Sequence, residues 1–185
     1  MSKKRYYISL ICLLMLCSTI YGVEIVTTTH NFSAMSGDKA QLEFSESNTV
    51  AKTPLLAYTC TNNAKFGVYT GSSSTGIGPI CILMSETGAT VTTSQVDNLR
   101  LLVIHYYYEG KEPYDADEII ISISVDSQVW NTPDEITYHK GSINVTMPST
   151  GDYFLKIARK TKNFYIHQIE YTTEKCACFP YIKPE

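Results

Sequence analysis

The sequence predicts an all-β fold, an antiparallel β-sandwich or jelly roll, on three observations. In the run 118–130, Ile119, Ile121 and Ile123 alternate with Ser122 and Ser124, as in a half-buried strand. Short runs of this kind recur at about ten-residue spacing, separated by clusters of Gly, Pro, Asn, Asp or Ser. Helical periodicity of useful length is absent outside the N-terminal apolar segment. Many short strands with turn signals favour a sandwich.

The expected strands follow from the same alternation. The chain between them is rich in turn-forming residues, and 71–78, GSSSTGIG, is expected to form a loop. Asn62 and Asn63 tolerate the positive φ of tight turns, which predicts a hairpin between two neighbouring strands. Residues 148–152 are expected to turn the chain. The expected strands are 23–30, 40–45, 55–60, 65–70, 80–84, 89–93, 99–108, 119–125, 135–139, 142–147, 152–159 and 163–172.

The predicted core comes from the strands that alternate most clearly. The run 99–108 is apolar on both faces, which favours a place in the middle of a sheet. Ile166 and Ile169 are three residues apart, so both can point inward only if a β-bulge lies at His167 and Gln168. The six residues predicted to be buried between two sheets are Leu101, Val103, Ile121, Ile123, Leu155 and Ile157.

Residues 1–22 resemble a signal peptide, with a basic start, an apolar run and small residues before Val23. We therefore expect a single sandwich domain at 23–172, a C-terminal tail at 173–185, no transmembrane segment in the mature chain, and a secreted or cell-surface location. Lipoprotein processing at Cys17 is the alternative, although the preceding Leu16 is not small. Removing residues 1–22 takes away three basic residues and no acidic one, which lowers the formal net charge from −3 to −6 and gives no reason to expect a nucleic-acid partner.

The cysteines leave two interpretations open. Cys60 and Cys81 lie in neighbouring expected strands, so they could form a disulfide or stay buried as thiols. A bridge between Cys176 and Cys178 would close a small strained ring. Their Cys-x-Cys spacing is also a poor match to a zinc site.

The C-terminal half, roughly residues 97–172, resembles the jelly-roll, galactose-binding-like modules of exported bacterial proteins, including cleaved-adhesin-type domains. Part of the resemblance lies in a strand and turn in which Asp126 and Trp130 stand at the same positions as in the pattern of that family. His167 and Gln168 stand where that family often has two Asp residues, which removes a carboxylate that could help hold a structural calcium. The resemblance implies a fold that hosts many functions. Its four segments are 96–99, 122–130, 151–157 and 165–171.

Candidate ligand-binding residues are Trp130, Tyr114 and Tyr138. Aromatic rings stack on the C–H faces of sugars, and Tyr114 and Tyr138 lie near expected loops. Trp130 has a structural alternative, in which its ring anchors the turn against the sheet. Asp115 and Asp117 could direct oxygens to one side and bind calcium, although a solvated loop explains them as well. No other cofactor is indicated.

No arrangement in the sequence is typical of a catalytic site. The histidines lack the spacing of a metal site. His105 lies inside an apolar strand and is expected to be a hydrogen-bonded core residue. We therefore expect an exported non-catalytic binding or adhesion module, with a glycan or a cell-surface protein as its partner and carbohydrate as the favoured ligand class. The alternative is a structural or assembly protein that joins partners through exposed strand edges. The third hypothesis is a glycoside hydrolase.

The signal-peptide interpretation predicts the N-terminus of the exported protein. Expression in a secreting host should yield a chain that begins near Val23, because the small residues before it suit a signal peptidase. Intact-mass measurement checks this, and a mass that retains residues 1–22 would contradict it.

Overall fold

The computed structural model describes residues 22–32, 43–44, 47, 49–52, 56–68, 80–107 and 114–177. Two compact units divide the chain, and residues 26–174 form the larger one, which is a β-sandwich. The described part of the smaller unit consists of two extended segments, 22–25 and 175–177. The signal-segment residues 1–21 and the expected loop 71–78 lie outside the described residues. Within the described ranges there is no helix of the length and apolarity needed to cross a bilayer.

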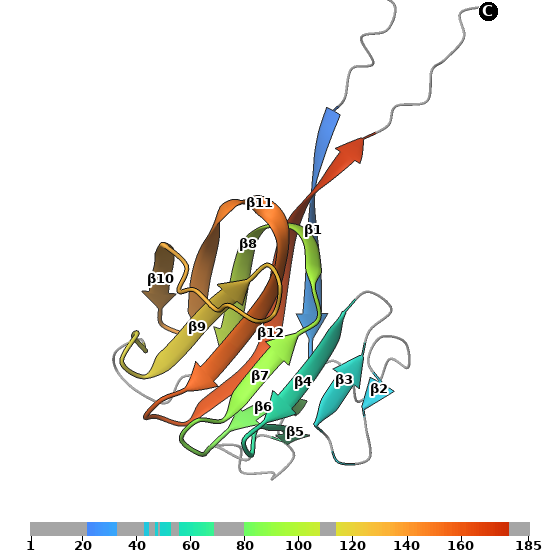
Figure 1. Ribbon diagram of the computed structural model, residues 1–185. Helices are drawn as coiled ribbons and strands as arrows, with labels where there is room; N and C mark the ends of the chain where they lie inside the picture. Colours follow the sequence, from blue (N-terminus) through green and yellow to red (C-terminus); the bar gives the residue numbers. More distant parts are fainter. Residues whose placement is uncertain are drawn as a thin grey trace, which may run out of the picture. The chain divides into compact units, whose positions relative to one another are not determined.

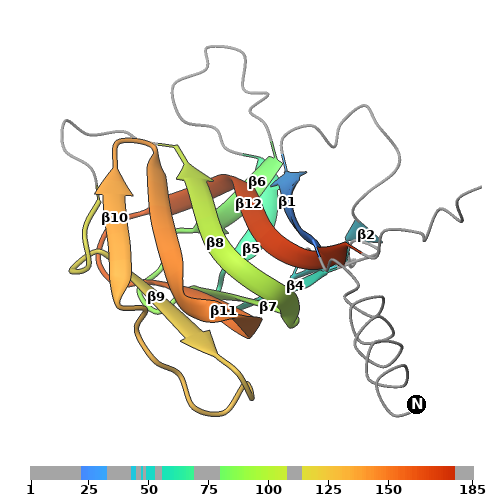
Figure 2. The same ribbon diagram turned by 90° about the horizontal axis from the view of Figure 1, so that it is seen from above.

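The sandwich confirms the predicted all-β, antiparallel class, with two sheets packed face to face (Figures 1 and 2). The front sheet of Figure 1 runs, in spatial order, through β2 (Glu43–Phe44), β3 (Val50–Lys52), β4 (Ala57–Thr61), β7 (Thr90–Thr93), the second half of β11 (Ser142–Arg159) and β9 (Ile119–Ser124). The back sheet runs through β10 (Glu135–His139), the first half of β11, β8 (Val96–Tyr106), β12 (Phe164–Ala177), β6 (Ile80–Met84) and β5 (Lys65–Val68), and β1 (Gly22–Asn31) pairs with β12.

Strand β11 belongs to both sheets. Its first half pairs with β8 and β10 of the back sheet, and Phe154–Arg159 pairs with β9 of the front sheet. The prediction of two strands separated by a turn at 148–152 was therefore wrong. The pairing register with β8 shifts between Thr146 and Tyr153, so this Pro- and Gly-containing stretch bends the strand from one sheet to the other without ending it.

The hairpin predicted around Asn62 and Asn63 is also corrected. Both residues do have positive φ, 53° and 66°, so the turn itself was predicted correctly. However, β4 pairs with β3 and β7 in the front sheet, whereas β5 pairs with β6 in the back sheet. Turn residues specify a change of direction and not the sheet that the next strand joins, so this turn crosses the sandwich.

Strand β8 presents a different face to the core than predicted. Leu99, Leu102 and Ile104 are fully buried, while Leu101 and Val103 are only half-buried. The cause is a bulge, because β8 advances two residues, from Leu99 to Leu101, where its neighbour β12 advances one. An extra residue reverses the alternation from that point on, since side chains alternate with a period of two.

The rest of the core agrees with the sequence. Ile121, Ile123, Leu155 and Ile157 are buried as predicted. The predicted bulge at His167 and Gln168 is confirmed, because β12 advances two residues there while β8 advances one, and Ile166 and Ile169 both point inward. Cys60 and Cys81 are buried free thiols, and burial raises the pKa of each to about 12.

The bulge in β8 predicts unequal costs for two neighbouring leucines. Leu102→Ala removes a fully buried side chain and should lower the free energy of unfolding by about 2–5 kcal/mol. Leu101→Ala, the matched control on the outer face, should cost about 1 kcal/mol or less. Urea denaturation of the two variants measures the difference. Equal losses would mean that both leucines reach the core and that the bulge is absent.

Candidate functional site

The turn after β9 is held by one carboxylate. Asp126 accepts hydrogen bonds from the Ser124 hydroxyl at 2.9 Å and from the backbone N–H groups of Gln128 at 2.8 Å and Val129 at 3.0 Å. The bonds from Val129 and Gln128, followed by that from Ser124, lower the pKa of Asp126 below its ordinary value of 3.8. Ser127 completes the turn with a φ of 62°. Asp126 therefore builds the turn, and the hydrogen bonds that it accepts stabilise its ionised form.

Beyond the turn, the chain returns along β9. Asn131 and Ile123 exchange two backbone hydrogen bonds, of 2.8 and 2.9 Å. This pairing brings the segment Asn131, Thr132, Pro133 and Asp134 beside the end of β9. A short stretch that the sequence indicates only as a turn is thereby fixed as one wall of a pocket.

The pocket has a volume of about 500 Å³ and opens to solvent. Exposed polar side chains line it from the returning segment, namely those of Asn131, Thr132 and Asp134. Its apolar surface comes from the end of β9, from the returning segment, and from β11 on both sides of the bend between the two sheets. These apolar lining residues are Ile123, Val125, Pro133, Pro148 and Tyr153.

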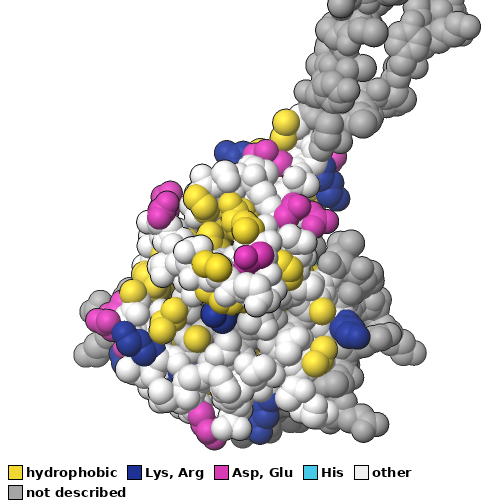
Figure 3. Space-filling view, in the orientation of Figure 1, with side chains coloured by type: hydrophobic (Ala, Val, Ile, Leu, Met, Phe, Trp, Pro, Cys, Tyr) yellow, Lys and Arg dark blue, Asp and Glu magenta, His cyan; other side chains and the backbone are white. Residues whose placement is uncertain are grey.

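The turn also exposes apolar side chains beside this pocket. Val125 and Val129 are 67% and 63% exposed, which is unusual for side chains of this size. The hydroxyl of Tyr153, whose ring is buried, donates to the Ser149 carbonyl at 3.1 Å, which fixes the position of this ring in the apolar wall. Figure 3 shows hydrophobic side chains gathered on the upper part of the front face, with acidic side chains around them.

Trp130 lies at the edge of the front sheet. Its side chain is half-buried, and the Lys156 ammonium of β11 lies 4.1 Å from the ring centroid. This is a cation–π contact between the segment after β9 and the middle of the sheet. The ring therefore packs against Lys156 of the front sheet, and part of it is still accessible to solvent.

The two tyrosines predicted as ligand contacts lie in other surroundings. Tyr114 is 7% exposed, its hydroxyl donates to the Asn163 carbonyl at 2.7 Å, and its ring stacks on Tyr106 at 4.9 Å. Tyr114 is thus a core residue, and we leave it out of the candidate site. Tyr138 on β10 is half-buried against the core, and burial raises its pKa, with a smaller contribution from Asp115.

The two aspartates predicted as calcium ligands lie together in the turn before β9. An Asp115 carboxylate oxygen accepts from the Asp117 N–H at 2.8 Å, and Asp117 pairs with Lys160 at 3.3 Å. Both carboxylates thus have protein partners. In the described part of the chain, no group of three or more His, Cys, Asp or Glu side chains is arranged to hold a metal ion. Calcium binding at Asp115 and Asp117 stays a prediction.

His105 is hydrogen-bonded as expected but does not lie in the core. Its Nε2 lies 3.1 Å from Glu170, which also accepts a hydrogen bond of 2.6 Å from Gln168. The His167 ring lies 6.1 Å away, between centroids, and burial together with the nearby His105 lowers the pKa of His167. The bulge in β8 turns His105 to the outer face of the back sheet, which sequence alternation did not predict.

Sequence reasoning missed the residues that line the pocket. Asn131, Thr132 and Asp134 were interpreted only as turn formers, and Tyr153 only as a strand residue. The available signal was the resemblance of 122–130 and 151–157 to segments of one fold, which implied that these segments are close in space. It did not imply that they enclose a pocket.

No protein-family model and no curated protein sequence matches the chain. Among solved structures, it is similar to a family two carbohydrate esterase from Cellvibrio japonicus, at 10% identity and a TM-score of 0.39, covering 86% of this chain and 37% of that one. It is also similar to CpGH89CBM32-6 produced by Clostridium perfringens, at 15% identity and a TM-score of 0.36, covering 82% and 93%. A third similar structure, from the Ruminococcus flavefaciens cellulosome, has 14% identity and a TM-score of 0.33, covering 80% and 94%. The chain thus spans little more than a third of the esterase, and such low values do not identify what it binds.

The low pKa of Asp126 predicts a pH-dependent role in stability. A carboxyl group whose pKa is lower in the folded than in the unfolded state stabilises the fold above its unfolded value, near 3.8, and this contribution disappears as the pH falls through the lower folded value. Asp126→Asn should therefore be less stable than the wild type at pH 6, and the difference should shrink below about pH 4.

Denaturant titrations at several pH values between 3 and 6 measure this difference. Asp97→Asn, which removes an exposed carboxylate from β8, is the control for the loss of charge alone. A deficit of Asp126→Asn that stays constant over the whole pH range would contradict the role of the ionised carboxylate.

Proposed function

We propose that this chain is an exported, non-catalytic carbohydrate-binding module and that the pocket beside β9 takes a sugar. The observation that carries the proposal is the pairing, in one open pocket of about 500 Å³, of exposed amide, hydroxyl and carboxylate groups with an apolar wall. Sugars present hydroxyls at the ring edge and C–H groups on the ring faces, so a site of this mixed chemistry suits them.

The lining also favours binding over hydrolysis. Asp134 is the one carboxylate among the residues that line the pocket. Glycoside hydrolysis commonly uses two carboxyl groups that flank the scissile bond. A pocket with one carboxylate and neutral polar partners can orient hydroxyls but lacks the acid–base pair.

Export and adhesion remain parts of the proposal that rest on the sequence. The basic and apolar N-terminal residues support export, and an exported glycan-binding module would act at the cell surface or beyond it.

Assembly through strand edges has less support, because β10, at one edge of the back sheet, exposes Glu135 and His139. Polar and charged side chains on an edge strand disfavour pairing with another chain.

Binding of the protein to a glycan array, with calcium and with a chelator, tests the proposal. Asp134→Ala and Asn131→Ala should each weaken binding of the glycan about tenfold, since each removes a polar partner from the pocket. The unfolding midpoint should stay unchanged, because both side chains are exposed.

Asp97→Ala serves as the matched control, since it removes an exposed carboxylate from β8 of the other sheet. An array on which no glycan binds, or an equal loss with the Asp97 variant, would count against the pocket. Comparison of the calcium and chelator arms tests the predicted role of Asp115 and Asp117 separately.

A further inference from the structure

The outer face of the front sheet carries a continuous row of side chains across five strands. The register pairs Val50 with Thr59, Thr59 with Thr92, Thr92 with Lys156, and Lys156 with Ser122. Residues paired across a sheet point to the same face. The row therefore runs from β3 to β9.

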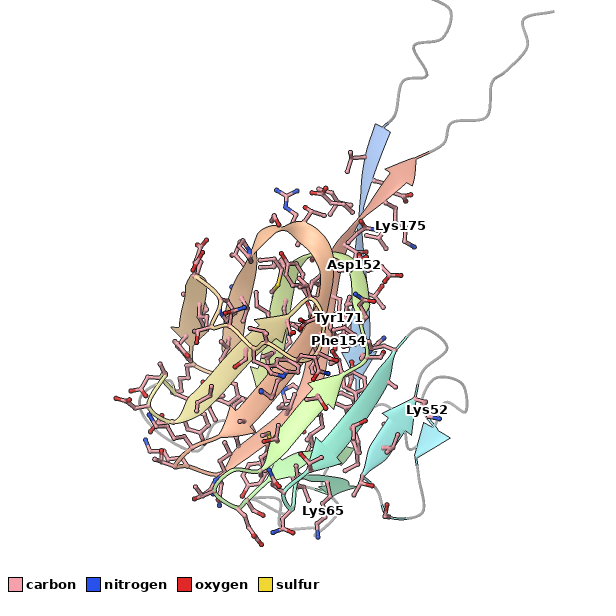
Figure 4. The ribbon with its side chains drawn as sticks, viewed as in Figure 1. Lys52, Lys65, Asp152, Phe154, Tyr171 and Lys175 are labelled. Carbon is pink, nitrogen blue, oxygen red and sulfur yellow. The ribbon has the colours of Figure 1, made fainter. Side chains whose placement is uncertain are left out.

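Four members of the row, on β3, β4, β7 and β11, are exposed or half-buried, whereas Ser122 at its β9 end is buried. Tyr58, Val91 and Ile157 are buried and alternate along their strands with the members of the row. Adjacent positions on the same outer face add Phe154, opposite Ser124, and Lys52, opposite Ala57. Figure 4 shows Lys52 on β3 and Phe154 on β11 of the sheet nearest the viewer.

The chemistry of this face is hydroxyl-rich and cationic. In Figure 3, the middle of the face is mainly white, the colour of backbone atoms and of side chains that are neither charged nor hydrophobic. Thr59 and Thr92 have their hydroxyls at paired positions, and Lys156 follows in the same row. No Asp or Glu occupies a position of this row, so Lys156 is its one charged side chain and gives it a positive charge.

The register also pairs Glu43 of β2 with Lys52, at the end of the sheet far from Lys156. Two acidic residues that flank β9 and β11 are held by other groups. Asp126, after β9, is bonded to the Ser124 hydroxyl and two backbone N–H groups. Asp152, two residues before Phe154, accepts from the backbone N–H of Asn98 at 2.8 Å. Within the described ranges, no carboxylate forms an ion pair with Lys156.

Lys156 is held in place by Trp130. Its ammonium lies 4.1 Å from the centroid of the indole ring, which restricts a side chain that would otherwise be flexible. A cation that is already positioned loses less conformational entropy when it binds an anion. Trp130 is half-buried, so part of its ring is available beside the ammonium.

We propose that this face binds an extended polysaccharide that carries carboxylates, that is, a chain containing uronic acids. The Lys156 ammonium pairs with a sugar carboxylate, the accessible part of Trp130 contacts the sugar ring, and Thr92 and Thr59 bond hydroxyls farther along the chain. Neighbouring strands are spaced by about 4.8 Å, so the accessible part of the row spans about 14 Å from β3 to β11, the length of a short oligosaccharide. Lys156 and Trp130 are not among the residues that line the pocket, so this site is distinct from it and extends the proposed function to a second, anionic ligand class.

Titration of the protein with polygalacturonate and with its methyl-esterified form tests the proposal. The two polymers differ in the carboxylate charge, so the acid form should bind at least about tenfold more tightly, and its binding should weaken as salt rises. Lys156→Gln should weaken binding of the acid form by about tenfold. Lys65→Gln, which removes an exposed lysine on β5 of the back sheet, should leave it unchanged.

The outcomes separate this face from the pocket. Asp134→Ala should keep full binding of polygalacturonate, whether or not it loses the glycan found on the array. No binding of polygalacturonate, equal binding of the two polymers, or an equal effect of Lys156→Gln and Lys65→Gln would each overturn the proposal. A loss with Asp134→Ala as large as that with Lys156→Gln would place the polymer in the pocket and would overturn it too.

Discussion

The pairing of β11 with both sheets is the constraint on which the rest of the structure depends. One strand continues from β8 and β10 to β7 and β9, so each sheet fixes the register of the other through the same backbone. The bend at Pro148 and Gly151 then determines where the two sheets diverge. Both candidate surfaces adjoin this strand, because Pro148 and Tyr153 line the pocket and Lys156 lies on the outer face.

The parts of the fold that depend on neighbours in sequence were predictable. Alternation identified the buried faces of β9 and of the second half of β11, and the spacing of Ile166 and Ile169 predicted the bulge in β12. The bulge in β8 escaped prediction because Leu101 and Leu102 are both apolar, so either alternation fits the sequence. The strands before and after Asn62 and Asn63, β4 and β5, go to opposite sheets, and that choice depends on tertiary packing rather than on the turn.

The candidate site was less predictable than the fold. Trp130 was singled out from sequence because it is the single tryptophan, and it does lie beside the β9 turn. Asn131 and Asp134 gain a functional interpretation only because the chain folds back along β9. Tyr114 sits near a loop in sequence yet stacks inside the core, since loop ends can turn inward where a hydrogen-bond acceptor such as the Asn163 carbonyl is available. Pocket formation thus requires contacts between segments that no local pattern encodes.

The buried thiols of Cys60 and Cys81 bear on the surroundings that the folded domain can withstand. Thiol oxidation and disulfide exchange require a thiolate that a reagent can reach. Both side chains lie inside the sandwich, with pKa values raised to about 12, so at neutral pH they are protonated and shielded. The core around these thiols is therefore held by packing and hydrogen bonds, and the folded domain shields both of them in reducing and in oxidising surroundings alike.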